Sequence, residues 1–307
     1  MEETVYQGAS AYQSVEIVQT ERFGRVLILD GIVQTTEKDE FIYHEMLVHV
    51  PMFSSSTPRD VLIIGGGDGG ALREVLRHDI ERVDMIEIDR QVVEKCVEHL
   101  PSLNRGGTVY DDPRTNLVIE DAFVYLNREQ RRYDVIICDS TDPIGAGEIL
   151  FSREFYALCE RSLNPGGVMS LQDGVVFFQP NEARDTIRNL RELGLNSTGY
   201  RVAVPSYYGG SMILAFAARR NAEFTPSVGQ LRQRFSRLNG ALQHYTPDHH
   251  LGSFALPKWI ESITGEIRNY FPCGGCFMDV RIRGRFKLTC QKPIIGCCKF
   301  SSLFDIN

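Results

Sequence analysis

The sequence lacks several features that would point to a membrane, secreted or nucleic-acid-binding protein. No apolar run in its 307 residues approaches the roughly 18 that a membrane-spanning helix needs. The first residues, Met-Glu-Glu-Thr-Val-Tyr-Gln, contain neither a basic region nor an apolar core, so we expect no secretory signal peptide. The formal net charge of −7 gives no reason to expect nucleic-acid binding and suits cationic ligands. We therefore expect a cytoplasmic protein.

Cysteine is sparse in most of the chain and crowded at its end. Cys96, Cys138 and Cys159 stand alone in apolar stretches, where we expect small buried hydrophobic side chains. The other five are Cys273, Cys276, Cys290, Cys297 and Cys298. Residues 266–307 also carry seven Lys or Arg against three Asp or Glu. A zinc site on the first pair is one interpretation, but the later spacing favours a divergent extension with little fixed structure.

Strand and helix signals alternate through the middle of the chain. The expected strands are 60–64, 83–88, 116–119, 133–138, 166–172, 197–204 and 211–217, and the expected helices are 70–78, 90–99, 121–129, 152–162 and 181–193. Nearly continuous apolar strands between helices are typical of a parallel sheet covered on both faces. The last two strands are joined too closely for a crossover helix, so they should pair antiparallel. The predicted fold class is α/β, with a seven-stranded Rossmann-like sheet of the methyltransferase type.

A small antiparallel domain is expected before this sheet. Apolar and polar side chains alternate over residues 12–37 around glycine turns, which is typical of a β-meander. Asp39 stands where it can cap a helix that ends at Pro51, and residues 226–264 should add a helix and loops. We predict three segments: an N-terminal β-meander with a linking helix at 1–50, a Rossmann-like catalytic domain at 51–264, and a cysteine-rich basic tail at 265–307.

A glycine-rich turn followed by an acid is the most informative motif. The first strand of the sheet leads into Gly65-Gly-Gly-Asp68-Gly-Gly70, and the second ends at Glu87, which predicts a nucleoside site where the acid binds ribose hydroxyls. The spacing Gly65-x-Gly67-x-x-Gly70 also fits the dinucleotide pattern, a weak signal by itself. Asp68 argues against that match, because a pyrophosphate needs N–H donors and no negative charge. It favours a cationic nucleoside such as a sulfonium.

Acidic residues follow five successive predicted strands. They are Asp68, then Glu87 and Asp89, then Glu120 and Asp121, then Asp139 and Asp142, and finally Asp173 beside Gln172. Because ligands bind outside the carboxyl ends of such strands, the acids predict a negative cleft for a cation. Asp139 and Asp142 suit a base and an ammonium anchor, although Asp before Pro is also ordinary turn chemistry. His44 fits a structural histidine as well as a ligand contact.

Several long motifs carry a resemblance to a known family. They are Leu29-Asp-Gly-Ile-Val-Gln-Thr-Thr-Glu-Lys-Asp-Glu-Phe-Ile-Tyr43-His44-Glu45-Met, Gly65-Gly-Gly-Asp68-Gly, Asp139-Ser-Thr-Asp142-Pro-Ile-Gly, Pro205-Ser-Tyr207-Tyr208-Gly-Gly and Phe254-Ala-Leu-Pro257. Over roughly residues 4–262 they resemble the polyamine aminopropyltransferases, with bacterial spermidine synthases closest. The resemblance implies transfer of the aminopropyl group of decarboxylated S-adenosylmethionine to putrescine, giving spermidine and 5′-methylthioadenosine. It also implies a homodimer or homotetramer. Because the sulfonium of this donor is already a good leaving group, we expect neither a metal nor an organic cofactor.

The resemblance further implies roles for matched positions. It implies that the donor is bound by Gln13, Asp68, Glu87, Asp121, Ala122 and Ala146. Ala146 stands at a position where relatives often have proline. The resemblance assigns the acceptor amine to Tyr43, His44, Asp142, Gln172 and Tyr207. Asp139 would accept the proton. Asp68 would repel the carboxylate of ordinary S-adenosylmethionine and attract the decarboxylated form, so one acid would both select and reject.

Some alternatives stay open at this level. Asp173 stands where bacterial relatives usually have asparagine, which would add a charge near the acceptor site. Cadaverine, agmatine or a longer polyamine would use the same acids as putrescine. Methyl transfer from ordinary S-adenosylmethionine is the nearest other reaction, and a nucleoside-binding module without catalysis is a rival of another class. A dehydrogenase is disfavoured by Asp68.

Overall fold

The structure is a computed structural model that describes residues 3–143, 145–208, 210–219, 222, 225–265, 272–273 and 276–277. The chain divides into two compact units, Met1–Gly265 and Glu266–Asn307. In the second unit, β12 (Pro272–Cys273) pairs antiparallel with β13 (Cys276–Phe277). The other predicted features of the tail, with Cys290, Cys297 and Cys298, lie outside the described residues.

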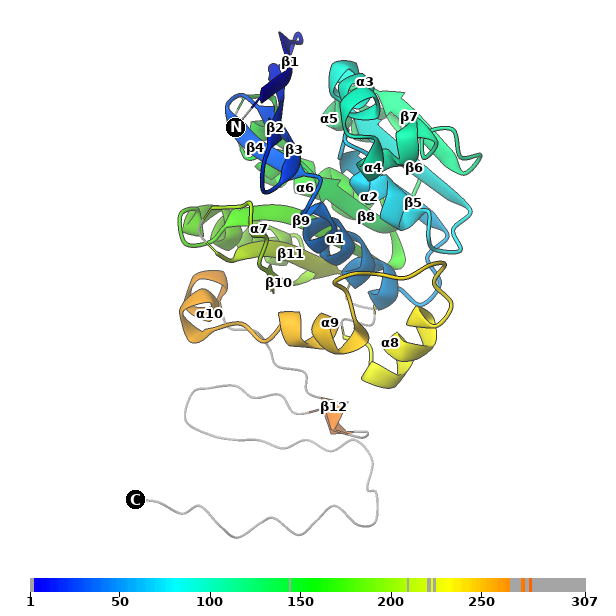
Figure 1. Ribbon diagram of the computed structural model, residues 1–307. Coiled ribbons are helices and arrows are strands. Elements are labelled where there is room, and N and C mark those ends of the chain that lie inside the picture. Colours follow the sequence, from blue (N-terminus) through cyan, green and yellow to red (C-terminus); the bar gives the residue numbers. More distant parts are fainter. Residues whose placement is uncertain are drawn as a thin grey trace. The chain divides into compact units, whose positions relative to one another are not determined.

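A four-stranded antiparallel sheet opens the first unit (Figure 1). Its strands, in spatial as in chain order, are β1 (Glu3–Ala9), β2 (Ser14–Thr20), β3 (Gly24–Leu29) and β4 (Ile32–Thr36). This confirms the predicted meander and adds β1, whose residues are all exposed or half-buried and so give little alternation. Val15 and Leu29, paired across β2 and β3, pack on Cys96 and Leu103. The sheet is thus attached through α3 (Arg90–His99) and α4 (Pro101–Asn104).

The helix α1 (Glu40–Ser54) connects the two sheets and corrects two sequence predictions. Asp39 precedes the helix but makes no side-chain cap; its Oδ2 accepts the N–H of Ser206 at 2.7 Å instead. Pro51 does not end the helix, which continues to Ser54. A proline removes the hydrogen bond of its own nitrogen, but the residues after it can keep theirs, and the N–H of Ser55 donates to the Pro51 carbonyl at 3.0 Å. The domain boundary predicted at residue 50 falls inside α1, and the division into domains stays a prediction.

Seven strands form the main sheet in the order β10-β11-β9-β8-β5-β6-β7. They are β5 (Asp60–Gly65), β6 (Arg82–Glu87), β7 (Thr115–Ile119), β8 (Tyr133–Asp139), β9 (Leu163–Val175), β10 (Asn196–Val202) and β11 (Met212–Ala218). β9 to β7 run parallel, while β11 is antiparallel to both its neighbours. The predicted fold class is confirmed, and each predicted strand overlaps an observed one.

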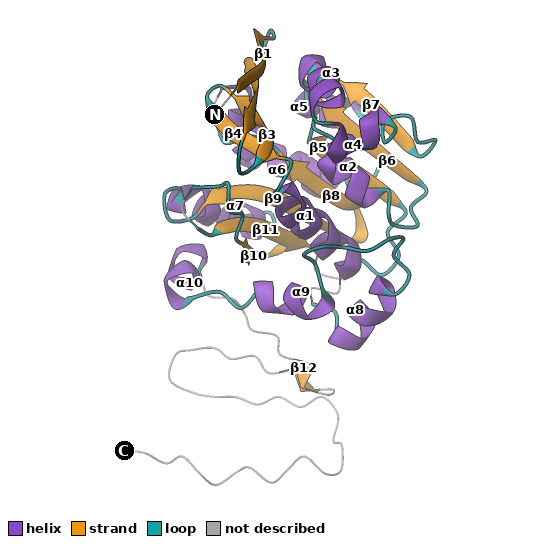
Figure 2. Cartoon of the chain, in the orientation of Figure 1, coloured by secondary structure: helices purple, strands orange, loops and turns teal. Residues whose placement is uncertain are grey.

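Helices cover both faces of the main sheet (Figure 2). Since side chains alternate along a strand, Val61 and Ile63 face one hydrophobic cluster with α1 and α2 (Gly70–Val75). Leu62 and Ile64 face a second cluster with α5 (Ala122–Arg128), α6 (Arg153–Arg161) and α7 (Pro180–Glu192). Two 3₁₀ segments, η1 (Arg105–Gly107) and η2 (Gly145–Phe151), lie in the connections.

Three short helices follow the last strand, where the sequence predicted only one with loops. They are α8 (Val228–Phe235), α9 (Pro247–Ser253) and α10 (Lys258–Thr264). The loop before α9 is held by Glu45 of α1, whose carboxylate accepts the backbone N–H groups of residues 243, 244 and 245 at 2.8 Å each. No helix within the described part of the chain is long and apolar enough to cross a membrane.

The strand order changes direction between β5 and β8, which brings the glycine-rich turn against the end of β8. Gly65 pairs with Asp139 in register, and both Gly65 and Gly66 have positive φ angles, of 78° and 72°. A Cβ on Gly65 would overlap the carbonyl oxygen of Asp139. Glycine is therefore required here both by conformation and by the close approach of the two strands.

We predict that Gly65→Ala destabilises the fold more than Gly166→Ala. Gly166 in β9 also has a positive φ, of 81°, but no atom lies within 4 Å of its Cβ position. Both variants carry the strain of a left-handed alanine, about 1–2 kcal/mol, whereas Gly65→Ala adds an overlap with backbone worth about 1–3 kcal/mol more. Chemical denaturation of both variants measures the difference. Equal losses would contradict a tight contact at Gly65.

Candidate active site

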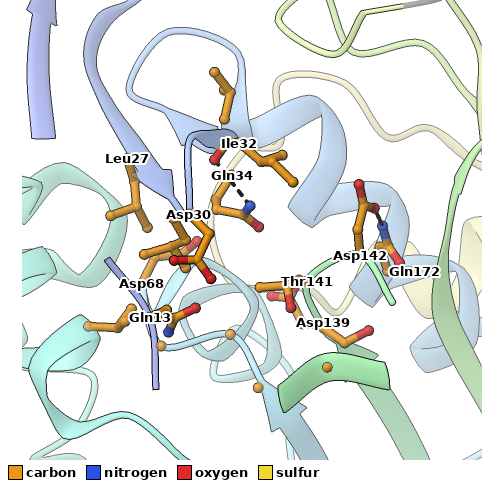
Figure 3. Close-up of a pocket in the computed structure, with 18 of the residues that line it drawn as sticks. Gln13, Leu27, Asp30, Ile32, Gln34, Asp68, Asp139, Thr141, Asp142 and Gln172 are labelled. Carbon is orange, nitrogen blue, oxygen red and sulfur yellow. Dashed lines mark hydrogen bonds between the residues drawn. The ribbon is translucent and has the colours of Figure 1, made fainter. Parts of the chain in front are cut away.

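A cavity of about 570 Å³ lies at the carboxyl ends of β5, β6 and β8. Its walls come from β3 and β4 of the small sheet, from the glycine-rich turn, and from the loops after β8, β9 and β10. Figure 3 shows Gln13, Asp30 and Asp68 on one side of it and Asp142 with Gln172 on the other. This is the position where open α/β sheets bind ligands.

The glycine-rich turn presents the Asp68 carboxylate to the cavity. Its Oδ1 accepts the backbone N–H of Gly70 at 2.6 Å, and the carbonyl oxygen of Asp68 accepts from the Asn104 side chain at 3.1 Å. The turn is further held by Tyr110, whose hydroxyl donates to the Gly67 carbonyl at 3.0 Å. The carboxylate is thus fixed in place rather than carried on a free loop.

Glu87 lies at the end of β6 and lines the cavity near the small sheet. It is only 7% exposed, and burial raises the pKa of its carboxyl to about 7. The backbone N–H of Asp89 donates to its Oε1 at 2.8 Å. Gln13, which also lines the cavity, donates to Asp89 Oδ2 at 3.0 Å. This end of the cavity therefore offers a buried carboxyl and an amide, groups that suit hydroxyl donors.

Asp139 ends β8 beside the glycine-rich turn. The Tyr43 hydroxyl donates to its Oδ1 at 2.7 Å, while its buried Oδ2 has no hydrogen-bond partner among the described residues. Burial raises the pKa of Asp139 to about 6; the neighbouring His44 opposes this and the carboxylate of Asp68 adds to it. Such an acid is mostly ionised at neutral pH yet more basic than an ordinary aspartate, as a general base requires.

His44 lies behind the two acids rather than on the cavity wall. Its Nδ1 is 2.6 Å from Glu40 Oε2, and its Nε2 is 3.5 Å from Asp68 Oδ1 and 3.9 Å from Asp139 Oδ2. The ring is 1% exposed. The surrounding carboxylates raise the pKa of His44 well above its usual value, in spite of burial, which lowers it. The acids around His44 thus favour the charged form of its ring.

Asp142 and Gln172 meet at the other end of the cavity (Figure 3). The Gln172 amide nitrogen donates to Asp142 Oδ1 at 3.2 Å, and its buried amide oxygen has no hydrogen-bond partner within the described residues. Tyr207 lies between this end and Tyr43, with ring centroids 5.8 Å apart in an edge contact. An acceptor oxygen and a carboxylate here can bind a second cationic group.

Most of the predicted site residues line this one cavity, and three described ones do not. Gln13, Tyr43, Asp68, Glu87, Asp139, Asp142, Gln172 and Tyr207 line it. His44, Asp121 and Ala122 are absent from its lining. Asp121 caps α5 through the N–H of Phe123 at 2.7 Å. Ala146 belongs to η2, and its side chain lies outside what the structure describes.

Asp173 corrects a sequence prediction. It lies inside β9, is 0% exposed and does not line the cavity, although Gln172 next to it does. Burial raises the pKa of the Asp173 carboxyl well above its usual value, which favours the uncharged form of the side chain. Asp173 is not placed to add a charge to the acceptor end, because alternation along the strand turns it away from its neighbour.

Sequence reasoning missed two groups of residues. The first lines the cavity: Tyr12, Leu27, Asp30, Gln34, Thr141 and Phe178. The second is the buried pair of Glu40 and Arg73 behind His44. The spacing of Glu40 and His44, four residues apart on one helix, was a signal for their contact. Nothing in the sequence connected either of them to Arg73. In the described parts of the chain, no three His, Cys, Asp or Glu side chains are grouped as a metal ion would require.

Comparisons with known proteins agree with this geometry. The Spermine/spermidine synthase domain matches residues 40–226, and the Spermidine synthase tetramerisation domain matches residues 1–37. The polyamine aminopropyltransferase of Pectobacterium atrosepticum is 47% identical over 263 residues, which cover 85% of this chain and 91% of that protein. Polyamine aminopropyltransferase 1 of Pseudomonas aeruginosa is 45% identical over 283 residues, covering 87% and 98%.

Solved structures give the same result. A spermidine synthase in complex with the transition-state analogue AdoDATO aligns with a TM-score of 0.79 and 37% identity, covering 85% of this chain and 88% of that one. The spermidine synthase of Thermotoga maritima aligns with a TM-score of 0.76 and 35% identity, covering 85% and 87%. The resemblance read from the sequence motifs is confirmed. This chain belongs to the spermine/spermidine synthase family, the enzymes known as polyamine aminopropyltransferases.

Proposed function

We propose that the protein transfers the aminopropyl group of decarboxylated S-adenosylmethionine to putrescine, giving spermidine and 5′-methylthioadenosine. The observation that carries this proposal is that Asp68 and Asp139 line a single cavity between Glu87 and Asp142. Four acids in a row suit a cationic donor and a dicationic acceptor. The names of the relatives and the transition-state-analogue complex of a structural neighbour support the same reaction.

The donor would lie along the turn from Glu87 to Asp68. The ribose hydroxyls would donate to Glu87, and Gln13 would contact the nucleoside from the small sheet. Asp121, Ala122 and Ala146 are further proposed contacts; Ile119, two residues before Asp121, pairs with Glu87. Asp68 would bind the ammonium of the aminopropyl arm. A carboxylate on that arm, as in ordinary S-adenosylmethionine, would be repelled by Asp68.

The acceptor would lie from Asp139 to Asp142, with Tyr43 and Tyr207 along its alkyl chain. The Asp142 carboxylate and the free amide oxygen of Gln172 would hold the distal ammonium. The reacting nitrogen would then face Asp139 Oδ2, the oxygen without a hydrogen-bond partner in the described residues. A diamine with a charge at each end suits two separated acids.

The chemistry needs a free lone pair on an amine that is normally protonated. Such an amine has a pKa of about 10.4, so few molecules are neutral at pH 7. Asp139 would take the proton as the nitrogen attacks the carbon next to sulfur; the carbon–nitrogen bond forms, the carbon–sulfur bond breaks, and its electron pair stays on sulfur. Because the sulfonium leaves as a neutral thioether, we propose that no cofactor takes part. Orientation by the acids supplies much of the rate.

The same proposal extends to assembly and location. Residues 1–37 match a tetramerisation domain and form the small sheet, so we propose that this sheet joins copies of the chain into a homo-oligomer, a tetramer or a dimer. Both proposed substrates are soluble cations, and we propose the cytoplasm as their compartment.

We expect Asp139→Asn to lower turnover by about 10²–10⁴-fold, the usual contribution of a general base.

In the wild type, kcat/KM for putrescine at saturating donor should fall as the pH drops through about 6, because the raised pKa of Asp139 lets the carboxylate take up a proton there. Release of methylthioadenosine measures both. Asp111→Asn, in an exposed turn, is the matched control. If wild type and Asp139→Asn are equally slow, Asp139 is not the base.

Asp68→Asn should weaken selection between the two donors. Loss of the carboxylate removes the attraction for the aminopropyl ammonium and the repulsion of a donor carboxylate. We expect the preference for decarboxylated over ordinary S-adenosylmethionine to fall by about 10–100-fold, equivalent to about 1.4–2.8 kcal/mol. Calorimetric titration of each donor into wild type and variant measures this without turnover. An unchanged preference would remove Asp68 from donor selection, and turnover of the ordinary donor alone would contradict the function.

A further inference from the structure

A series of buried charged side chains leads from the cavity into the core, through His44, Glu40 and Arg73. We propose that His44 is a built-in counter-cation that keeps Asp68 and Asp139 ionised together in the empty site, and that Glu40 and Arg73 hold it in its charged form. The consequence for turnover rests on the proposed function, since it takes Asp139 as the base. The proposed arrangement of charges around His44 does not depend on the proposed function.

The contacts of the His44 ring favour an imidazolium. Glu40 Oε2 lies 2.6 Å from Nδ1, and two further carboxylates face Nε2, Asp68 at 3.5 Å and Asp139 at 3.9 Å. A neutral imidazole has one donor and one acceptor nitrogen, whereas the charged ring has two donors. Only the charged form satisfies carboxylates on both sides.

The ring has no room to turn away from these acids. A Cβ on Gly70 would overlap its atoms, so α2 packs directly against it, and the Tyr43 ring makes an edge contact at 5.2 Å. The titratable groups facing His44 are therefore Glu40 from its own helix, Asp68 from the glycine-rich turn, Asp139 from β8, and Tyr43 beside it. All of them except the Tyr43 phenol are carboxyl groups.

Glu40 is held as an anion by Arg73 of α2. The guanidinium donates to both carboxylate oxygens, at 2.9 and 2.8 Å, and its Nε donates to Glu74 at 2.8 Å. Glu74 in turn forms an ion pair with Arg77 at 2.7 Å and contacts His49 at 3.0 Å. The hydrogen bonds and charges of His44 and Arg73 lower the pKa of Glu40 despite its burial. The partner of Nδ1 is thus charged throughout the working pH range.

The benefit of such a cation follows from the closeness of the two cavity acids. Two buried carboxylates that share a site repel each other, and one of them is then protonated at neutral pH. The charge of His44 lowers the pKa of Asp139, whereas Asp68 raises it. Because His44 does not line the cavity, it acts through the acids and is a positioning residue rather than a catalytic one.

The charge of His44 can be measured in the ligand-free protein. We expect NMR of the full chain, labelled in its histidines, to find His44 still protonated at a pH where an ordinary histidine has lost its proton. Its signal is assigned by its loss in His44→Gln. In Glu40→Gln the same signal should titrate at lower pH. A wild-type His44 that titrates near 6.5 would overturn the proposal, and an unchanged titration in Glu40→Gln would overturn the role of Glu40.

The effect on the acids appears in the pH profile of turnover. In His44→Gln and Glu40→Gln, we expect the acid limb of kcat/KM for putrescine to move up by about one pH unit, while rates on the alkaline plateau stay within a few-fold of wild type. A merely structural role would lower the rate equally at all pH values, and that result would overturn the proposal. Glu21→Gln, in an exposed turn, is the matched control. If neither the wild type nor any variant transfers aminopropyl groups, the proposed function is wrong. The NMR titration then still decides whether His44 is a counter-cation.

Discussion

The pairing of Gly65 with Asp139 across β5 and β8 is the constraint on which the site depends. These strands lie where the sheet order changes direction, so their carboxyl ends diverge into loops and leave a cavity. Only glycine permits the turn after β5 to approach the β8 backbone this closely. The same turn then presents Asp68 beside Asp139. A small shift in this register would separate the two acids and leave neither placed for a shared ligand.

Burial of these acids sets their chemistry. A carboxylate taken out of water becomes harder to ionise, and a neighbouring carboxylate makes this worse. Tyr43 stabilises the charge of Asp139 by a hydrogen bond, and His44 stabilises it by charge. The result is an acid with a pKa of about 6, which suits a base at neutral pH. Tyr43 on the cavity wall and His44 behind it therefore both favour the ionised form of Asp139.

The sequence was sufficient for the sheet and for most of the cavity acids, because both follow from local patterns. Apolar runs locate strands, and a residue directly after a parallel strand must lie at one known edge. Asp173 was misplaced because the end of β9 was predicted too early, at residue 172. Helices α9 and α10 were missed because each is only one or two turns long. The contact of Arg73 with Glu40 joins residues 33 positions apart on two helices, and no local pattern reports such a contact.

The balance of charge in the cavity gives a physical reason for the selectivity that we propose. Five acids line it, namely Asp30, Asp68, Glu87, Asp139 and Asp142, and no Lys, Arg or His among the described residues does. His44 lies behind two of these acids, so the site has more acids than cations even after the counter-cation is counted. Cationic ligands are attracted into such a site, and a ligand that brings its own carboxylate loses part of that attraction. A more positive site would no longer favour cations. In a site without His44, one of the two acids beside it would hold a proton and lose its negative charge. The buried imidazolium thus lets the site stay both negative and ionised.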